Sequence, residues 1–214
     1  RKSKFLSAML SVCMTFSAVP AVYAAGDGAG TSDIDGHWAK TALEEFIKDG
    51  YLNGDGNGNY MPNGTMTRAQ FAAILNRMLR YTEESADITK YSDITAAAWY
   101  RADMAKALAA GYMSGTSEDN MSPETAVTRE QAFVMLARIL KLDTSDTSSL
   151  SAYADADDVS DWAKGSTAAL IKAGYVSGDD NKKINPKKPM TRAEGVTVLS
   201  RSKAALDEHK VITK

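Results

Sequence analysis

The chain contains 214 residues, of which 44% are hydrophobic, and it carries a net charge of −2 and a single cysteine. A chain of this length can bury a hydrophobic core, and that core must hold the fold together because one cysteine cannot form an internal disulfide. The mildly acidic charge argues against nonspecific binding to nucleic acid, so no nucleic-acid partner is expected.

Residues 1–24 have the features of a secretory signal peptide. Three basic residues open the segment, an apolar stretch follows from Phe5 to Val22, and Val22-Tyr23-Ala24 offers small residues before a cleavage point. Serines and a proline make the apolar stretch a poor membrane span, and a retained membrane anchor is the alternative. Removal of the segment would eliminate Cys13, change the net charge to −5 and leave an exported protein without a membrane partner.

A glycine-rich lead-in at residues 25–32, which we expect to be mobile, precedes three copies of one repeat. Each Gly follows its Trp by 12 residues, each Pro follows that Gly by 12, and each Thr follows that Pro by 5. The recurring positions are Trp38, Trp99 and Trp162; Gly50, Gly111 and Gly174; Pro62, Pro123 and Pro186; Thr67, Thr128 and Thr191. We expect modules at 33–81, 91–142 and 153–203, with polar connectors between them and a C-terminal tail at 204–214.

Each module has the pattern helix, loop, helix. In the first copy Trp38, Ala39, Leu43 and Phe46 share one helical face, and this helix is expected to end at the glycine of "GYLNG" (50–54). "GYMSG" (111–115) and "GYVSG" (174–178) give the same stop signal. Neither helix of a module can bury its apolar face alone. The predicted fold is therefore all-α, with the three modules sharing one core.

The second helix of each module is expected to begin with a capping box. A Thr stands at each N-cap, and Gln or Glu follows three residues later. The six capping residues are Thr67, Gln70, Thr128, Gln131, Thr191 and Glu194.

An arginine follows each capping Thr, at the first helical position, where it opposes the helix dipole by roughly 0.3–1 kcal/mol. A single case would indicate a solvent-facing side chain, but Arg68, Arg129 and Arg192 repeat it in all three copies. Amide groups at a helix start attract anions, and an arginine beside them adds a forked donor for carboxylate or phosphate. The sequence therefore predicts three linked anion sites, which together would bind a polymer carrying spaced negative charges.

The motifs "TRAQ" (67–70), "TREQ" (128–131) and "TRAE" (191–194), with the recurring Asp, Trp, Gly-Tyr and Pro, resemble the S-layer homology (SLH) domain family. The resemblance covers about residues 33–201. It implies a pseudo-threefold helical domain with ligand grooves between neighbouring modules. It also implies non-covalent attachment of an exported protein to the bacterial cell wall through pyruvylated secondary cell-wall polysaccharide. The pyruvate ketal carries a carboxylate, which is the kind of anion that the arginines are predicted to bind. Other surface-layer subunits are a further expected partner.

By position, the resemblance assigns contact with the polysaccharide to four sets of residues. They are Arg68, Arg129 and Arg192; Trp38, Trp99 and Trp162; Asp33, Asp93 and Asp157; and Gly54, Gly115 and Gly178. In the third copy Asp155 is an equal candidate for the acidic position. The structural alternatives are core packing for the Trp residues, capping of the first helix for the Asp residues, and turn geometry for the Gly residues.

Other functions fit the sequence less well. His37 and His209 are the only histidines and no nucleophile motif surrounds them, so no catalytic site is expected within this chain. "DGNGNYMPNGTM" (55–66) begins like a calcium loop but has Tyr60 at the glycine position and Met66 at the closing glutamate position, so neither a metal nor a cofactor is expected. Two alternatives stay open: the anchoring portion of a larger extracellular enzyme such as a polysaccharide hydrolase, and a helical-repeat adaptor that binds peptides in an apolar groove.

Overall fold

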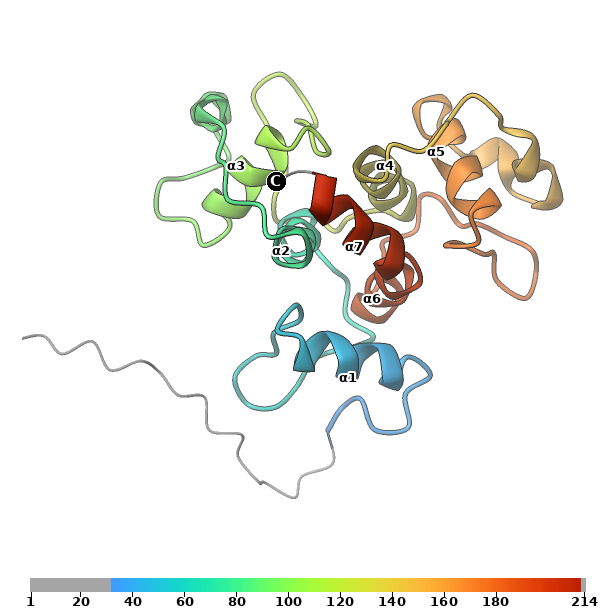
Figure 1. Ribbon diagram of the computed structural model, residues 1–214, viewed down its shortest axis with the longest axis horizontal. Helices are drawn as coiled ribbons and strands as arrows, with labels where there is room; N and C mark the ends of the chain where they lie inside the picture. Colours follow the sequence, from blue (N-terminus) through green and yellow to red (C-terminus); the bar gives the residue numbers. More distant parts are fainter. Residues whose placement is uncertain (1–31, 213–214) are drawn as a thin grey trace, which may run out of the picture. The chain divides into compact units, whose positions relative to one another are not determined.

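The computed structural model describes residues 32–212, which form seven α-helices and three short 3₁₀ helices (Figure 1). The expected signal peptide and residues 25–31 of the lead-in lie outside the described residues. The α-helices are α1 (Lys40–Lys48), α2 (Arg68–Leu79), α3 (Arg101–Ala109), α4 (Arg129–Ile139), α5 (Asp161–Lys172), α6 (Arg192–Arg201) and α7 (Lys203–Ile212). The 3₁₀ helices η1 (Ala86–Lys90) and η2 (Ser148–Ala152) lie in the stretches that join the repeats, and η3 (Ala156–Asp158) lies near the start of the third repeat. The all-α prediction is confirmed.

The first helix of each repeat ends as its glycine predicts. Gly50, Gly111 and Gly174 have φ angles of 73°, 72° and 76°, a left-handed conformation that glycine adopts without a steric penalty. In the first repeat, the ring of Tyr51 then packs edge-on against Phe46, with their ring centroids 5.6 Å apart. None of the helices in the described part of the chain is long and apolar enough to cross a membrane.

The helices pack across repeat boundaries. Helix α2 of the first repeat packs against α3 of the second, α4 of the second against α5 of the third, and α6 of the third against α1 of the first. Figure 1 shows α2, α4 and α6 inside and α1, α3 and α5 around them. The apolar faces form one continuous core that includes Leu43, Met104 and Leu170, so each packing unit combines two repeats.

Three residues that precede the capping threonines close the repeats into a ring. Met66 donates its backbone N–H to the carbonyl of Met190, Met190 donates to Val127, and Val127 donates to Met66, each with an N···O distance of 2.9 Å. All three side chains are fully buried. Because every donor and acceptor in this ring comes from a different repeat, no repeat can complete it alone.

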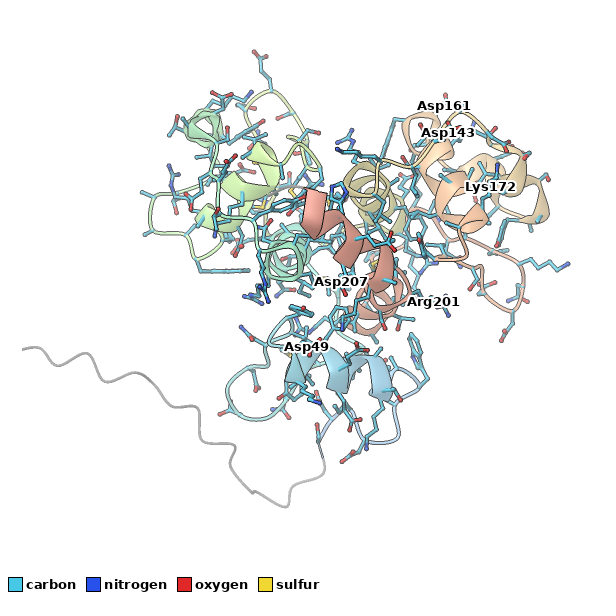
Figure 2. The ribbon with its side chains drawn as sticks, in the orientation of Figure 1. Asp49, Asp143, Asp161, Lys172, Arg201 and Asp207 are labelled. Atoms are coloured by element: carbon cyan, nitrogen blue, oxygen red, sulfur yellow. The ribbon has the colours of Figure 1, made fainter. Side chains whose placement is uncertain are left out.

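Most of the predicted C-terminal tail, residues 204–214, belongs to helix α7. Helix α7 packs on α2 and α6, and Leu206 is fully buried among them. The Nζ atom of Lys203 lies 2.6 Å from Glu45 of α1 and 3.0 Å from Asp49, the residue that caps the C-terminal end of α1 and is labelled in Figure 2. Helix α7 therefore links the last repeat to the first.

Two helical glycines predict opposite responses to alanine. A Cβ at Gly165 of α5 would lie 2.2 Å from the backbone oxygen of Thr144, whereas a Cβ at Gly195 of α6 would lie 3.1 Å from the terminal methyl group of Met66, the end of a flexible type of side chain. Gly165→Ala should lower the free energy of unfolding by about 1–2 kcal/mol, since overpacking exceeds the gain in helix propensity. Gly195→Ala should be neutral or mildly stabilising. Urea denaturation of both variants measures the difference, and equal effects would contradict this account of packing.

Candidate functional site

Each repeated motif begins its helix with a complete capping box. The hydroxyl of Thr67 accepts the N–H of Gln70, while the side-chain oxygen of Gln70 accepts the N–H of Thr67, at distances of 3.2 and 3.1 Å. The pairs Thr128 with Gln131 and Thr191 with Glu194 have the same arrangement.

The next two helix amides bind a loop of the following repeat. The N–H groups of Arg68 and Ala69 donate to the carbonyls of Thr125 and Pro123, at 3.0 and 2.9 Å. The same bonds join Arg129 to Lys188, Glu130 to Pro186, Arg192 to Gly64 and Ala193 to Pro62. These amides already have protein acceptors, so the expectation that free helix amides attract the ligand is wrong.

The side chains of the motif arginines also donate hydrogen bonds to carbonyls in a loop of the following repeat. Arg68 donates from Nε to the carbonyl of Met121 at 2.9 Å and from Nη2 to that of Ser114 at 3.0 Å. Arg192 donates in the same way to Tyr60 and Asn53, and Arg129 donates from Nε to Ile184. Each arginine thus binds a loop of the next repeat in a ring, which gives it a structural reason to stand at the first helical position.

Burial lowers the pKa of these arginines but does not remove their charge. Arg68 is 4% exposed and Arg192 is 7% exposed. Loss of solvent lowers the pKa of each motif guanidinium, and nearby acidic side chains, such as Asp93 for Arg68 and Asp33 for Arg192, act in the opposite direction. An arginine keeps its charge across the physiological range.

The leading acidic residue of each repeat holds the loop before the repeat's proline. Both oxygens of Asp93 lie 3.0–3.1 Å from the N–H of Met121, and Oδ2 accepts the N–H of Ser122 at 2.6 Å. Ser122 has a φ of 50°, a strained value for a residue before proline. Asp33 accepts the corresponding N–H groups of Tyr60 and Met61.

Asp155 has this position in the third repeat, where its oxygens accept the N–H groups of Ile184 and Asn185, both at 2.7 Å. Asp157, chosen from the sequence for this place, lies exposed in η3 instead. The alternative of helix capping is also wrong, because α1, α3 and α5 have no side-chain cap bond at their N-caps.

Asp155→Ala and Asp157→Ala form a matched pair that tests this difference. Asp155→Ala should lower the free energy of unfolding by about 2–4 kcal/mol, because it leaves two loop amides without their charged acceptor. Asp157→Ala should change it by less than about 0.5 kcal/mol, as for other exposed sites. Thermal denaturation measures both, and an equal loss would show that Asp155 does not hold the loop.

Gly54, Gly115 and Gly178 allow close approach by neighbouring parts of their own repeats. A Cβ at Gly54 would lie 2.6 Å from the oxygen of Asn59, and one at Gly115 would lie 2.5 Å from that of Ser117. At Gly178 the obstacle is the ring of Tyr153, at 2.6 Å. Internal packing therefore accounts for these glycines, and Gly115 and Gly178 also line the cavities described next.

One cavity, which we call groove A, has a volume of about 380 Å³ and takes residues from all three repeats. Its lining includes Arg68 from the first repeat, Ser114, Gly115, Gln131 and Arg138 from the second, and Trp162 from the third. The ring-shaped packing thus brings together residues that are remote in the sequence.

A second cavity, groove B, is related to groove A by one step around the ring. Its volume is about 250 Å³, and its lining includes Arg129, Ser177, Gly178, Glu194, Arg201 and Trp38. The corresponding residues for the third position in the ring are Arg192, Gln70, Arg77 and Trp99. Sequence analysis grouped each Trp with the Arg of its own repeat, whereas each groove combines a Trp and an Arg from different repeats.

The three tryptophans are surface residues. Trp38, Trp99 and Trp162 are 64%, 58% and 59% exposed, so the alternative that they anchor the core is wrong. An exposed indole beside a polar groove offers an apolar face to a ligand.

Sequence analysis missed a second set of arginines. Arg77, Arg138 and Arg201 each follow a motif arginine by nine residues, and all three are exposed. Arg138 lines groove A and Arg201 lines groove B; Figure 2 labels Arg201 at the end of α6. The repeated spacing of nine residues was a signal that could have identified them.

The two sets of arginines should respond differently to alanine. Arg68→Ala should lower the free energy of unfolding by about 3 kcal/mol, since it removes two buried bonds from a charged donor. Arg138→Ala, in the exposed set, should change it by less than about 0.5 kcal/mol. Chemical denaturation tests the pair. A fully stable Arg68→Ala protein would contradict the loop-binding role.

An all-α ring of three repeats with an arginine and an exposed tryptophan at each inter-repeat groove defines a class of repeat-built binding domains. The family model of the S-layer homology domain matches the chain at residues 30–72, 90–133 and 152–194. The chain therefore belongs to the S-layer homology domain family.

Similar proteins include surface-layer proteins and enzymes. The chain is 29% identical to the surface-layer 125 kDa protein of Lysinibacillus sphaericus over 99% of its own length and 18% of that protein. It is 30% identical to the amylopullulanase of Thermoanaerobacterium thermosulfurigenes and to the exoglucanase XynX of Acetivibrio thermocellus, in each case over 78% of its own length. These matches span 9% and 16% of the two enzymes, so the chain corresponds to less than a fifth of each relative.

Proposed function

We propose that this chain attaches an exported protein to the bacterial cell wall by holding an acidic, pyruvylated wall polysaccharide non-covalently in its inter-repeat grooves. The observation that carries this proposal is the composition of groove A, where the charged groups Arg68 and Arg138 lie with the exposed Trp162. A guanidinium pairs with the carboxylate of a pyruvate ketal, and an indole packs on the apolar face of a sugar ring. Family membership and the surface-layer relatives support a location at the cell surface.

The two arginines of a groove contribute differently to this mechanism. In groove A the motif arginine, Arg68, is buried and held by loop carbonyls, so its charge is fixed in place before the ligand arrives. The second arginine is exposed and can follow the ligand. Because a polymer can occupy more than one groove of the same chain, weak individual contacts add up to firm attachment.

Tryptophan substitutions test the proposal better than substitutions of the motif arginines, which would also disturb the ring. The triple variant Trp38→Ala, Trp99→Ala and Trp162→Ala should keep the helical circular dichroism spectrum, because all three side chains are largely exposed. Sedimentation with purified walls should fall roughly tenfold or more, as loss of three ring contacts is amplified by multivalency.

Walls from which the pyruvyl groups have been chemically removed are the matched control for the ligand. The unaltered protein should lose binding to these walls, and high salt should weaken its binding to intact walls. Unchanged sedimentation with pyruvyl-free walls would refute the acidic-sugar mechanism.

A second function, that of the anchoring portion of a larger extracellular enzyme, is favoured by the amylopullulanase and exoglucanase relatives. Within the described residues no group of His, Cys, Asp and Glu could hold a metal ion. Fusion of this chain to an unrelated reporter enzyme distinguishes attachment from catalysis, because a portable anchor should carry the reporter to intact walls. The alternative of a peptide-binding adaptor predicts an apolar groove, whereas two arginines line groove A.

A further inference from the structure

The chain contains three Asn-Gly pairs, and all of them belong to the first repeat: Asn53-Gly54, Asn57-Gly58 and Asn63-Gly64. An asparagine before glycine can lose its side-chain amide, because the backbone nitrogen of the glycine attacks the Cγ atom of the asparagine and no glycine side chain obstructs the attack. Exposure of the pair and a glycine N–H without another partner favour this reaction. The three pairs differ in both respects.

The pair Asn63-Gly64 is protected by its contacts. The N–H of Gly64 donates to the carbonyl of Met61 at 2.9 Å, and the side-chain oxygen of Asn63 lies 3.2 Å from Nε2 of His37. The attacking nitrogen and the side chain that it would attack are therefore both held by other groups.

The other two pairs are exposed, and they differ from each other in one contact. No acceptor for the N–H of Gly54 or Gly58 occurs among the described residues. Nη2 of Arg192 donates to the carbonyl of Asn53 at 2.8 Å, whereas no donor to the carbonyl of Asn57 occurs in this part of the structure. The first pair thus has a cation on its own peptide bond.

This contact activates the nitrogen of Gly54. The carbonyl of Asn53 and the N–H of Gly54 belong to one resonant amide, so a positive charge at the oxygen draws electron density from the nitrogen and makes its proton easier to remove. The amide anion that attacks Cγ is then stabilised, as an oxyanion is stabilised by a preorganised donor. Arg192 is only 7% exposed and its Nε atom donates to the carbonyl of Tyr60, so the donor is fixed in position.

We propose that Asn53 is a site of spontaneous deamidation that Arg192 promotes. The nitrogen of Gly54 bonds to Cγ of Asn53, its proton leaves with the side-chain nitrogen as ammonia, and a five-membered succinimide ring forms. Water then opens the ring. When water adds to the carbonyl carbon beside Arg192, the bond from that carbon to the Gly54 nitrogen breaks and the nitrogen regains a proton. Residue 53 becomes isoaspartate, whose main chain runs through Cγ and whose free carboxylate replaces the former carbonyl.

The product changes the charge at one of the three inter-repeat positions. The new carboxylate lies beside Arg192, where it competes for the guanidinium with an acidic sugar; this consequence rests on the proposed function. The equivalent residues of the other repeats are Ser114 and Ser177, whose side chains cannot form a succinimide. Ageing by this reaction therefore weakens the position that contains Arg192 and Trp99 and leaves grooves A and B unchanged.

Each asparagine is its own control when the folded protein is compared with the chain unfolded in guanidinium chloride. Both samples are incubated at neutral pH, and peptide mass spectrometry follows the three pairs, with isoaspartate methyltransferase labelling to identify the isomer. Asn53 should deamidate roughly tenfold faster in the folded protein, a modest part of what one oxyanion donor contributes in an enzyme. Asn57 should react at similar rates in both samples, and Asn63 should react more slowly in the folded protein. A rate at Asn53 that folding does not raise, or equal acceleration of all three pairs, would overturn the proposal.

Asn53→Ser is the matched variant, because it introduces the residue that the other two repeats contain. Aged unaltered protein should sediment with intact walls severalfold less than fresh protein, whereas aged Asn53→Ser protein should equal its fresh form. Isoaspartate that forms without loss of wall binding would overturn the effect on the groove. Failure of fresh protein to bind walls would overturn the proposed function and leave the modification of Asn53 standing, since mass spectrometry detects it without a ligand.

Discussion

The ring of backbone hydrogen bonds among Met66, Val127 and Met190 is the constraint on which the rest of the structure depends. It fixes the starts of α2, α4 and α6 next to one another, with each bond crossing a repeat boundary. Helix amides and motif arginines then bind the loop of the following repeat, and α7 ties the last repeat to the first through Lys203. Because buried polar groups need partners, the repeats must assemble together to satisfy these donors and acceptors.

The same contacts make the grooves. Arg68 holds the loop that contains Ser114 and Gly115, and that loop then forms one wall of the cavity in which Arg68 lies. Stability and binding are therefore coupled through the motif arginines, whereas Trp162 and Arg138 contribute to the groove from exposed positions. The exposed groove residues therefore contribute little to the ring, whereas the motif arginines belong to both the ring and the grooves.

Features that depend on neighbours in the sequence were predicted correctly. The three capping boxes, the left-handed glycines after the first helices and the all-α fold follow from local backbone chemistry, which acts within about four residues. The apolar faces of the helices were equally readable from their period. The third acidic position was harder to assign, because Asp155 and Asp157 both lie in "YADADD" and only the distant loop at Ile184 distinguishes them.

The sequence by itself determined the repeat, its helices, its caps and the presence of an arginine and a tryptophan in every copy. Only the tertiary structure decided that the tryptophans are exposed, that Arg68 and Arg192 are buried and Arg129 is nearly so, and that each groove joins an arginine and a tryptophan from different repeats. Arg192, for example, binds the carbonyl of Asn53, 139 residues away. A pattern within one repeat carries no information about which other repeat will satisfy its donors, since closure of the ring makes that choice.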